Sequence, residues 1–284
     1  MSLERQRGFT LIELVITLVV STIVVGFVSL FISGPVMGFT DQARRARLVD
    51  AADAALRRIG RDVRRALPNS VRTTSAGGVI ALEVLSTVDG ARYRAQPSGV
   101  TALDFTAADG SLNVLGPFTQ LAKPWSSATH YLAVYNVGVP GADAYELANV
   151  ITPVNTTIDI SVDGATGEDR VTLAPAFRFA YSSPTQRVFL VDGPVTYLCD
   201  PVAGTLMRYQ GYSIAASQGS RDSHGELIGA GATASLMANQ LVSCSFAYTP
   251  GTAERAGLVS LQFAVSAQGE TVSLLSQVHV DNVP

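Results

Sequence analysis

Few residues in this chain of 284 combine a reactive type with an informative position, and Glu13 is the first of them. It stands at the start of an uncharged run, Leu14 to Ile32, whose only polar side chains are hydroxyls. A carboxylate costs about 2.5–3.5 kcal/mol at the centre of a bilayer and less near its edge. We therefore expect Glu13 either to stay at headgroup level, where the dipole of a helix N-terminus favours it, or to meet a cation inside an assembly.

The two cysteines, Cys199 and Cys244, are the next candidates. Both fall in apolar segments with strand-like patterns. Two buried free thiols are one interpretation, and a disulfide is favoured if this part of the chain is exported to an oxidising compartment. Two cysteines so far apart exclude CxxC redox chemistry and a four-cysteine zinc module.

Other reactive residue types do not form a recognised catalytic or metal pattern. Ser223 is followed by His224, but adjacency in sequence is not the geometry of a catalytic triad. Asp163, Glu168 and Asp169 make an acidic loop that is a weak calcium candidate, although it departs from the D-x-D-x-D-G pattern and a solvated hairpin turn is the preferred interpretation. The sequence thus favours a protein that is not an enzyme and needs no cofactor.

The uncharged run predicts a membrane helix. Its nineteen residues span about 28 Å at 1.5 Å each, which matches the hydrocarbon core of a bilayer. It is longer than a secretory h-region and lacks a small-residue cleavage site at its end. We therefore expect a retained single-pass helix, with the large C-terminal part on the exported side.

The residues around the start of this run resemble a known signal. Arg7-Gly8-Phe9-Thr10-Leu11-Ile12-Glu13-Leu14, after a short basic leader, is similar to the class III signal of type IV prepilins and pseudopilins. The resemblance implies cleavage between Gly8 and Phe9 by prepilin peptidase, and N-methylation of Phe9. It further implies that Glu13 meets the Phe9 amine of a neighbouring subunit.

The resemblance also implies partners and a location. The partners would be other pilin or pseudopilin subunits, prepilin peptidase, the inner-membrane assembly machinery and the membrane itself. The chain would span the inner membrane once, with a cytoplasmic N-terminus and an exported C-terminal domain, and would then enter a pilus or pseudopilus.

A second helical pattern follows the membrane run. Gly34-Pro35 predicts a break or kink, or in a filament a zone where the helix extends. Beyond it, an apolar residue recurs every three or four positions from Leu48 to Leu67, and Pro68 predicts the end of the helix. Arg57, Arg61, Arg64 and Arg65 lie mostly off this stripe, as a solvated face or as contacts to acidic surfaces of adjacent subunits.

Charge divides the chain into a basic first quarter and an acidic remainder. The net charge is +5 over residues 1–72 and −8 over residues 73–284. No aromatic residue is interleaved with the arginines between Phe39 and Pro68, so base stacking has no platform there and no nucleic acid is expected as a partner.

The remainder predicts antiparallel strands. Short apolar segments alternate with turn signals such as Asp89-Gly90, Asp109-Gly110, Asp163-Gly164, Asp192-Gly193 and Gln268-Gly269. Residues 187–199 and 262–275 each read as a hairpin. The predicted fold is α+β and pilin-like: a long N-terminal helix packed on an antiparallel sheet, with a leader (1–8), a transmembrane half (9–33), an amphipathic half (34–67) and an exported head (73–284).

Segments near the C-terminus extend the resemblance. Residues 195–199, 204–209, 242–246 and 277–284 look similar to minor pilin-like proteins of mannose-sensitive hemagglutinin (MSHA) pilus biogenesis, and minor pilin W and type II secretion pseudopilin J have comparable size and layout. We expect a minor type IV pilin-like subunit that is incorporated in a filament or primes it. The alternatives are a type II secretion minor pseudopilin, an anchored adhesin that binds through Trp125 or exposed tyrosines, and an anchored hydrolase.

Overall fold

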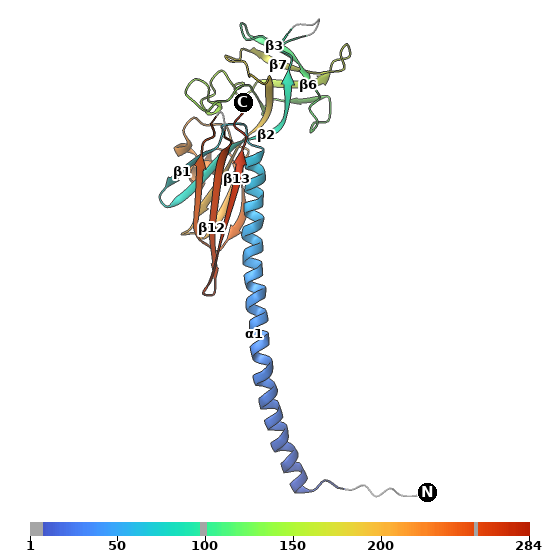
Figure 1. Cartoon of the computed structure of the whole chain (residues 1–284), viewed down its shortest axis with the longest axis vertical. Coiled ribbons are helices and arrows are strands. Elements are labelled where there is room, and N and C mark those ends of the chain that lie inside the picture. Colours follow the sequence, from blue (N-terminus) through green and yellow to red (C-terminus); the bar gives the residue numbers. More distant parts are fainter. Residues whose placement is uncertain (1–7, 97–100, 253–254) are drawn as a thin grey trace, which may run out of the picture. The chain divides into compact units, whose positions relative to one another are not determined.

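The computed structural model describes residues 8–96, 101–252 and 255–284 (Figure 1). The chain divides into two compact units, Met1–Leu48 and Val49–Pro284. The boundary falls within a helix, so the second unit contains the last turns of that helix together with the whole β-rich body.

The long helix α1 runs from Leu11 to Arg64. Its backbone is helical through Gly34 and Pro35, so a complete break there is not seen, and a loosening of the helix in an assembly stays a prediction. The predicted end at Leu67 is three residues too late. Ala66 already forms a bridge with Ser86, and the Leu67 N–H donates to the carbonyl of Leu85 (2.8 Å), so the backbone has joined the sheet before Pro68.

Thirteen strands and three short helices follow α1 in the described residues. The strands are β1 (Arg72–Ala76), β2 (Val79–Tyr93), β3 (Asp109–Leu115), β4 (Trp125–Ser127), β5 (Tyr131–Ala133), β6 (Thr157–Val162), β7 (Asp169–Phe177), β8 (Arg187–Asp200), β9 (Thr205–Gln210), β10 (Thr233–Asn239), β11 (Leu241–Thr249), β12 (Gly257–Ala267) and β13 (Glu270–Val280). The short helices are η1 (Ala144–Glu146), η2 (Gln218–Ser220) and α2 (His224–Gly229).

These strands form two antiparallel sheets, as the turn-rich pattern predicts. The larger has ten strands in the order β10-β9-β8-β2-β3-β7-β6-β4, with β1 on β2 and β5 on β8. Its centre is the pairing of β2 with β8, in register from Ile80–Cys199 to Arg92–Arg187. The smaller sheet is β11-β12-β13. The α+β pilin-like fold class is thereby confirmed.

One of the two predicted hairpins is wrong. Residues 187–200 form the single strand β8, and Asp192-Gly193 is a bulge inside it rather than a turn. The register steps from Ser86–Gly193 to Thr87–Val191, which leaves Asp192 as the extra residue, and Gly193 takes φ of +141°. Asp89-Gly90 likewise lies inside β2. Because β2 and β8 pair along nearly their full lengths, both Asp-Gly segments stay within strands, although their local sequence would allow a turn.

The other predicted turns differ in outcome. Asp163-Gly164 connects β6 to β7, and Gln268-Gly269 connects β12 to β13 in the predicted register, with Gln262 opposite Leu275. Asp109-Gly110 instead opens β3. A predicted turn therefore forms where no third strand pairs across the segment that carries the turn signal.

The second unit buries the helical stripe of α1 against the sheets. The apolar side chains of Ala52, Ile59 and Val63 have no exposed surface, and Leu56 and Leu67 are nearly as buried. Strand β13 lies beside this part of the helix (Figure 1): a Cβ added at Gly60 would stand 3.3 Å from Cγ2 of Val278. A glycine at this point of the helix allows the close approach of β13.

Candidate functional site

The N-terminal segment is an accessible, non-helical lead into α1. Gly8, Phe9 and Thr10 have no regular structure and are exposed, and the Phe9 side chain is 72% exposed. The peptide bond between Gly8 and Phe9 therefore lies in an exposed, non-helical segment, which a protease could bind in an extended conformation. The basic leader residues Arg5 and Arg7 lie outside the described residues.

Thr10 and Glu13 form a local clasp at the start of the helix. The Glu13 N–H donates to Oγ1 of Thr10 (3.4 Å), and the Thr10 hydroxyl donates to Oε2 of Glu13 (3.3 Å). The first N–H groups of a helix have no partner within it, and a threonine cap with an acid three residues on satisfies part of that need. The signal for this role, T-x-x-E before an apolar run, is present in the sequence, but sequence reasoning assigned Glu13 only to the dipole or to an assembly partner.

The apolar half of α1 presents its side chains outward on every side. Leu11–Ile32 has a mean hydropathy of 2.7 and is long enough to cross a membrane, and none of it is buried within the protein. Two of its hydroxyls bond to the helix backbone: Thr17 donates to the carbonyl of Leu14 (2.9 Å) and Thr22 to that of Leu18 (2.8 Å). Side chains that satisfy themselves in this way suit a hydrocarbon surrounding, where an unpaired hydroxyl is costly.

The end of α1 carries a polar link to the large sheet that sequence reasoning missed. Asp62 Oδ2 accepts hydrogen bonds from the Tyr197 hydroxyl (2.7 Å) on β8 and from Nε of Arg208 (2.9 Å) on β9. Burial raises the pKa of the Tyr197 hydroxyl, so it remains a donor. Asp62 also forms an i,i+4 ion pair with Arg58, at 3.5 Å. Only the fold could show that the stronger partners lie more than a hundred residues away.

The disulfide between Cys199 and Cys244 is confirmed. It joins β8 of the large sheet to β11 of the small one, with the two Cα atoms 6.5 Å apart. Both cysteines are thereby consumed, and the described residues contain no free thiol. The bond ties the two sheets that flank the end of α1.

The calcium candidate finds no support in the geometry. Each carboxylate has a cationic partner: Asp163 pairs with Arg170 (2.9 Å), Glu168 with Arg94, and Asp169 with Lys123 (2.5 Å). A hydrogen bond from the Asn113 amide lowers the pKa of Asp163, and one from Arg94 lowers the pKa of Glu168. Within the part of the chain that the structure describes, no three His, Cys, Asp or Glu side chains converge as metal ligands.

The serine of the Ser223-His224 pair has a structural task. Its hydroxyl accepts the Glu226 N–H (3.4 Å) as the N-cap of α2, while the Glu226 carboxylate accepts the Ser223 N–H in return. His224 instead contacts the Tyr209 hydroxyl through Nδ1 (2.7 Å). The two side chains do not form a nucleophile and its base.

A serine–histidine contact elsewhere, between Ser127 and His130, was not anticipated from the sequence. Ser127 Oγ lies 2.7 Å from Nδ1 of His130, and Nε2 of His130 lies 3.4 Å from Asp192. The ring nitrogens have the reverse of the triad assignment, in which Nε2 meets the serine. Ser127 Oγ also accepts the Thr129 N–H (3.1 Å), so it closes a tight turn. Trp125, the residue considered for adhesion, packs edge-on against His130 (5.1 Å between ring centroids) and is only partly exposed.

The arginine face at the end of α1 is largely solvated. Arg57 pairs with Asp53 (2.7 Å), one helical turn earlier. Arg61, Arg64 and Arg65 are exposed beside it. This agrees with a solvated face, and the suggested contact with other subunits stays a prediction.

Comparison with known proteins bears on the N-terminal segment alone. No curated protein and no solved structure matches the chain, so the closer likeness of its C-terminal segments to MSHA minor pilin-like proteins has no support. A family model described as the prokaryotic N-terminal methylation motif matches residues 4–29. That match covers Gly8, Phe9, Glu13 and most of the apolar half of α1, and it indicates an N-terminal segment of the type IV pilin-like or pseudopilin-like kind that prepilin peptidase processes. The single apolar helix is consistent with a membrane anchor.

Proposed function

We propose that this protein is a minor type IV pilin-like subunit whose work is mechanical. Prepilin peptidase removes residues 1–8 and methylates the new amino terminus at Phe9. The membrane helix then anchors the subunit in the inner membrane, with its N-terminus in the cytoplasm and its body exported. The assembly machinery finally moves it from lipid into a filament, which it enters or primes.

The observation that carries this proposal is the contrast in burial along α1. Its apolar half begins two residues after the Gly8–Phe9 bond and is exposed on every side, while its last turns are buried by the chain's own sheets. An exposed apolar rod of 22 residues must be covered by lipid or by similar rods. This exposed apolar surface suits a subunit that lies first in lipid and then among the helices of other subunits.

Glu13 supplies the register in this mechanism. The amine of mature Phe9 is one helical turn from Glu13, so a neighbouring helix shifted by about one turn brings the two charges together. An unpaired charge in a dry bundle is costly, so the pair selects one stagger over others. Before assembly the Thr10 hydroxyl holds the carboxylate, and this 3.3 Å hydrogen bond to Oε2 is one that the incoming amine can replace.

Mass spectrometry of the mature N-terminus tests the processing step. The chain purified from membranes that contain prepilin peptidase should begin at methylated Phe9, and the chain from a strain without the peptidase should begin at Met1. A product that keeps residues 1–8 in the presence of an active peptidase contradicts the proposal.

Exchange of Glu13 tests the assembly step. Glu13→Val should leave membrane insertion intact, because it removes a charge from the edge of an apolar helix, but should lower recovery in sheared filaments by about tenfold or more. Thr10→Val is the matched control, since it removes the cap and keeps the carboxylate. Equal recovery of the two variants at the wild-type level would show that Glu13 does not set the stagger.

The type II secretion alternative separates from the pilus proposal by phenotype. Deletion of the gene should reduce the number of surface pili and leave the secretion of folded exoproteins intact. The opposite result would assign the same helix chemistry to a secretion pseudopilus.

A further inference from the structure

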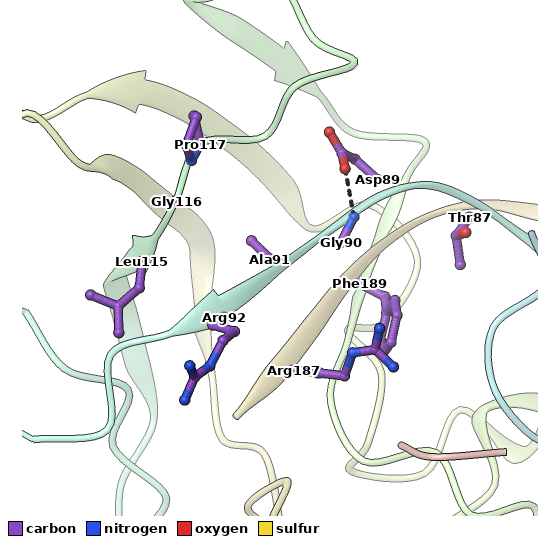
Figure 2. A pocket seen from close by; sticks show the side chains of 10 residues that line it. All are labelled: Thr87, Asp89, Gly90, Ala91, Arg92, Leu115, Gly116, Pro117, Arg187 and Phe189. Carbon is purple, nitrogen blue, oxygen red and sulfur yellow. Dashed lines mark hydrogen bonds between the residues drawn. The ribbon is translucent and has the colours of Figure 1, made fainter. Parts of the chain in front are cut away.

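A surface groove opens where β2 parts from β3. Strand β2 pairs with β8 along nearly its full length, but with β3 only at Arg92–Leu115 and Tyr93–Val114. Beyond these pairs the two strands separate, and a groove of about 540 Å³ lies between residues 89–91 on one side and residues 115–117 on the other (Figure 2).

Two arginines stand directly opposite each other at this groove. Arg92 on β2 and Arg187 on β8 are register partners, so their side chains leave the same face of the sheet at neighbouring positions. Like charges directly opposite on adjacent strands destabilise a sheet. Arg92 donates to the neutral amide oxygen of Gln186 (3.1 Å), and Arg187 pairs with the exposed Asp281 (3.0 Å). The local positive charge is therefore compensated only in part by these contacts.

An aromatic ring lies beside one of the two guanidinium groups, that of Arg187. Phe189 is two residues from Arg187 on β8, and the Arg187 guanidinium stands 5.4 Å from its ring centroid. Gly90 is the register partner of Phe189, and a Cβ there would lie 3.1 Å from Cδ1 of the ring. The glycine thus lets the partly exposed ring of Phe189 lie close against β2, and Figure 2 shows both residues at the groove. The groove is thus lined by two cations and an apolar ring.

The acidic group of the groove is already engaged. Asp89 accepts the N–H of Gly90 through Oδ1 (2.8 Å) and the N–H of Gln120 through Oδ2 (2.8 Å). In Figure 2 its carboxylate points away from the two arginines. Its negative charge is thus directed to backbone donors and leaves Arg92 and Arg187 to dominate the other end.

We infer that this groove binds an acidic, extended segment of a partner protein. The chain itself shows the chemistry, because Asp281 lies in the stretch without regular structure after β13 and its carboxylate pairs with Arg187. A second carboxylate, from the partner, would bridge the opposed guanidinium groups and relieve their repulsion, and an adjacent apolar side chain of the partner would cover Phe189. The separating strands give the segment room to lie in an extended conformation. This binding does not depend on the proposed filament role and would stand if the chain never entered a filament.

Fluorescence anisotropy with a labelled peptide tests the inference on the full chain in detergent micelles. The probe is a synthetic hexapeptide that alternates valine and threonine with one central aspartate, and its control carries lysine in place of aspartate. We expect saturable binding of the aspartate peptide, at least tenfold tighter than the lysine peptide, and weakening as salt screens the exposed charges.

Arg92→Gln is the decisive variant, because it removes one guanidinium and leaves the Arg187–Asp281 pair in place. It should weaken binding about tenfold, and the double variant with Arg187→Gln should abolish it. Arg178→Gln, an equal charge change at an exposed residue outside the groove, should bind as the wild type does. Unfolding curves of all variants check that the fold is kept.

Three outcomes would overturn the inference. Equal binding of the aspartate and lysine peptides would show that charge is not read, and equal binding by Arg92→Gln and the wild type would place any site elsewhere. A single-stranded oligonucleotide that binds more tightly than the peptide and loses affinity in the same variants would reassign the groove to polyanions.

Discussion

The two ends of α1 share one backbone geometry and meet opposite surroundings. In the apolar half, Ile23 is 53% exposed and lies among side chains that are exposed all around the helix. In the body half, Ile59 has no exposed surface and belongs to a single stripe, with arginines on the other side. The first half has an apolar surface that this chain does not cover, and the second has its packing partner in the same polypeptide.

This difference shows that forming a helix and packing it against the rest of the chain are separate requirements. Both halves have apolar residues and form helix, but among the described residues the buried side chains of α1 lie in the body half, and none of Leu11–Ile32 is buried. In the proposed function, the apolar half would exchange lipid for other helices without disturbing the body. Variants that act on one half and spare the other test this separation.

Loss of the disulfide should have the largest effect, and it should be confined to the body. The bond closes a loop of 45 residues between the two sheets of the body, which corresponds to about 4 kcal/mol of unfolding free energy in the chain-entropy model. The double variant Cys199→Ala/Cys244→Ala should lower the denaturant midpoint of the β-rich body, as followed by circular dichroism. Membrane insertion of the apolar half should not change. A loss below about 1 kcal/mol would mean that packing alone holds the two sheets together.

A matched pair of isoleucine truncations compares the two halves directly. Ile59→Ala should cost about 2–5 kcal/mol, because it leaves a cavity in a buried site. Ile23→Ala removes the same atoms from an exposed site and should leave the unfolding of the body unchanged within about 0.5 kcal/mol. If Ile23→Ala also destabilised the body, the two halves of α1 would not be independent.

A matched pair of aspartates compares the polar contacts of the body half with each other. Asp62→Ala removes the acceptor of Tyr197 and of Arg208, whose side chain is only 10% exposed, and should cost about 2–3 kcal/mol. Asp53→Ala breaks an exposed pair with Arg57 and should cost about 0.3–0.5 kcal/mol. The comparison fails if the two losses measured by denaturant unfolding are equal.

Much of the fold could be predicted from local patterns. Hydropathy located the membrane half of α1, the spacing of apolar residues located the buried stripe, and the β12–β13 hairpin followed from alternation around Gln268-Gly269. The hairpin at Asp192-Gly193 was wrong because a turn signal is local, whereas the fate of the segment was decided by twelve pairs with a strand a hundred residues earlier. Local sequence rules detect the propensity of a segment to turn, but they do not detect the distant partner strand that prevents the turn.

The candidate site divides in the same way. Gly8, Phe9 and Glu13 form a contiguous motif, so the sequence alone could identify them. Arg92 and Arg187 became a pair only through strand register, and Asp62 found Tyr197 and Arg208 only through the docking of α1 on the sheet. Sites assembled from distant strands carry no sequence signature in a single chain.

The smallest effect concerns the acid response of the body at the β6–β7 turn. The pKa of Asp163 lies below its usual 3.8 and that of Glu168 below 4.5, because Asn113 and Arg94 stabilise the charged forms. Such groups contribute stability above their unfolded pKa values, and the contribution is lost as the pH falls through the folded values. The denaturant midpoint of unfolding should therefore fall as the pH is lowered from about 5 towards 3. Asp163→Asn should make this dependence on pH less steep. Asp159→Asn, on the exposed face of the neighbouring strand β6, is the control and should keep the full acid response. An acid response that is unchanged in Asp163→Asn would mean that other carboxylates set it, and the ion pairs that occupy the calcium candidate would then be incidental to stability.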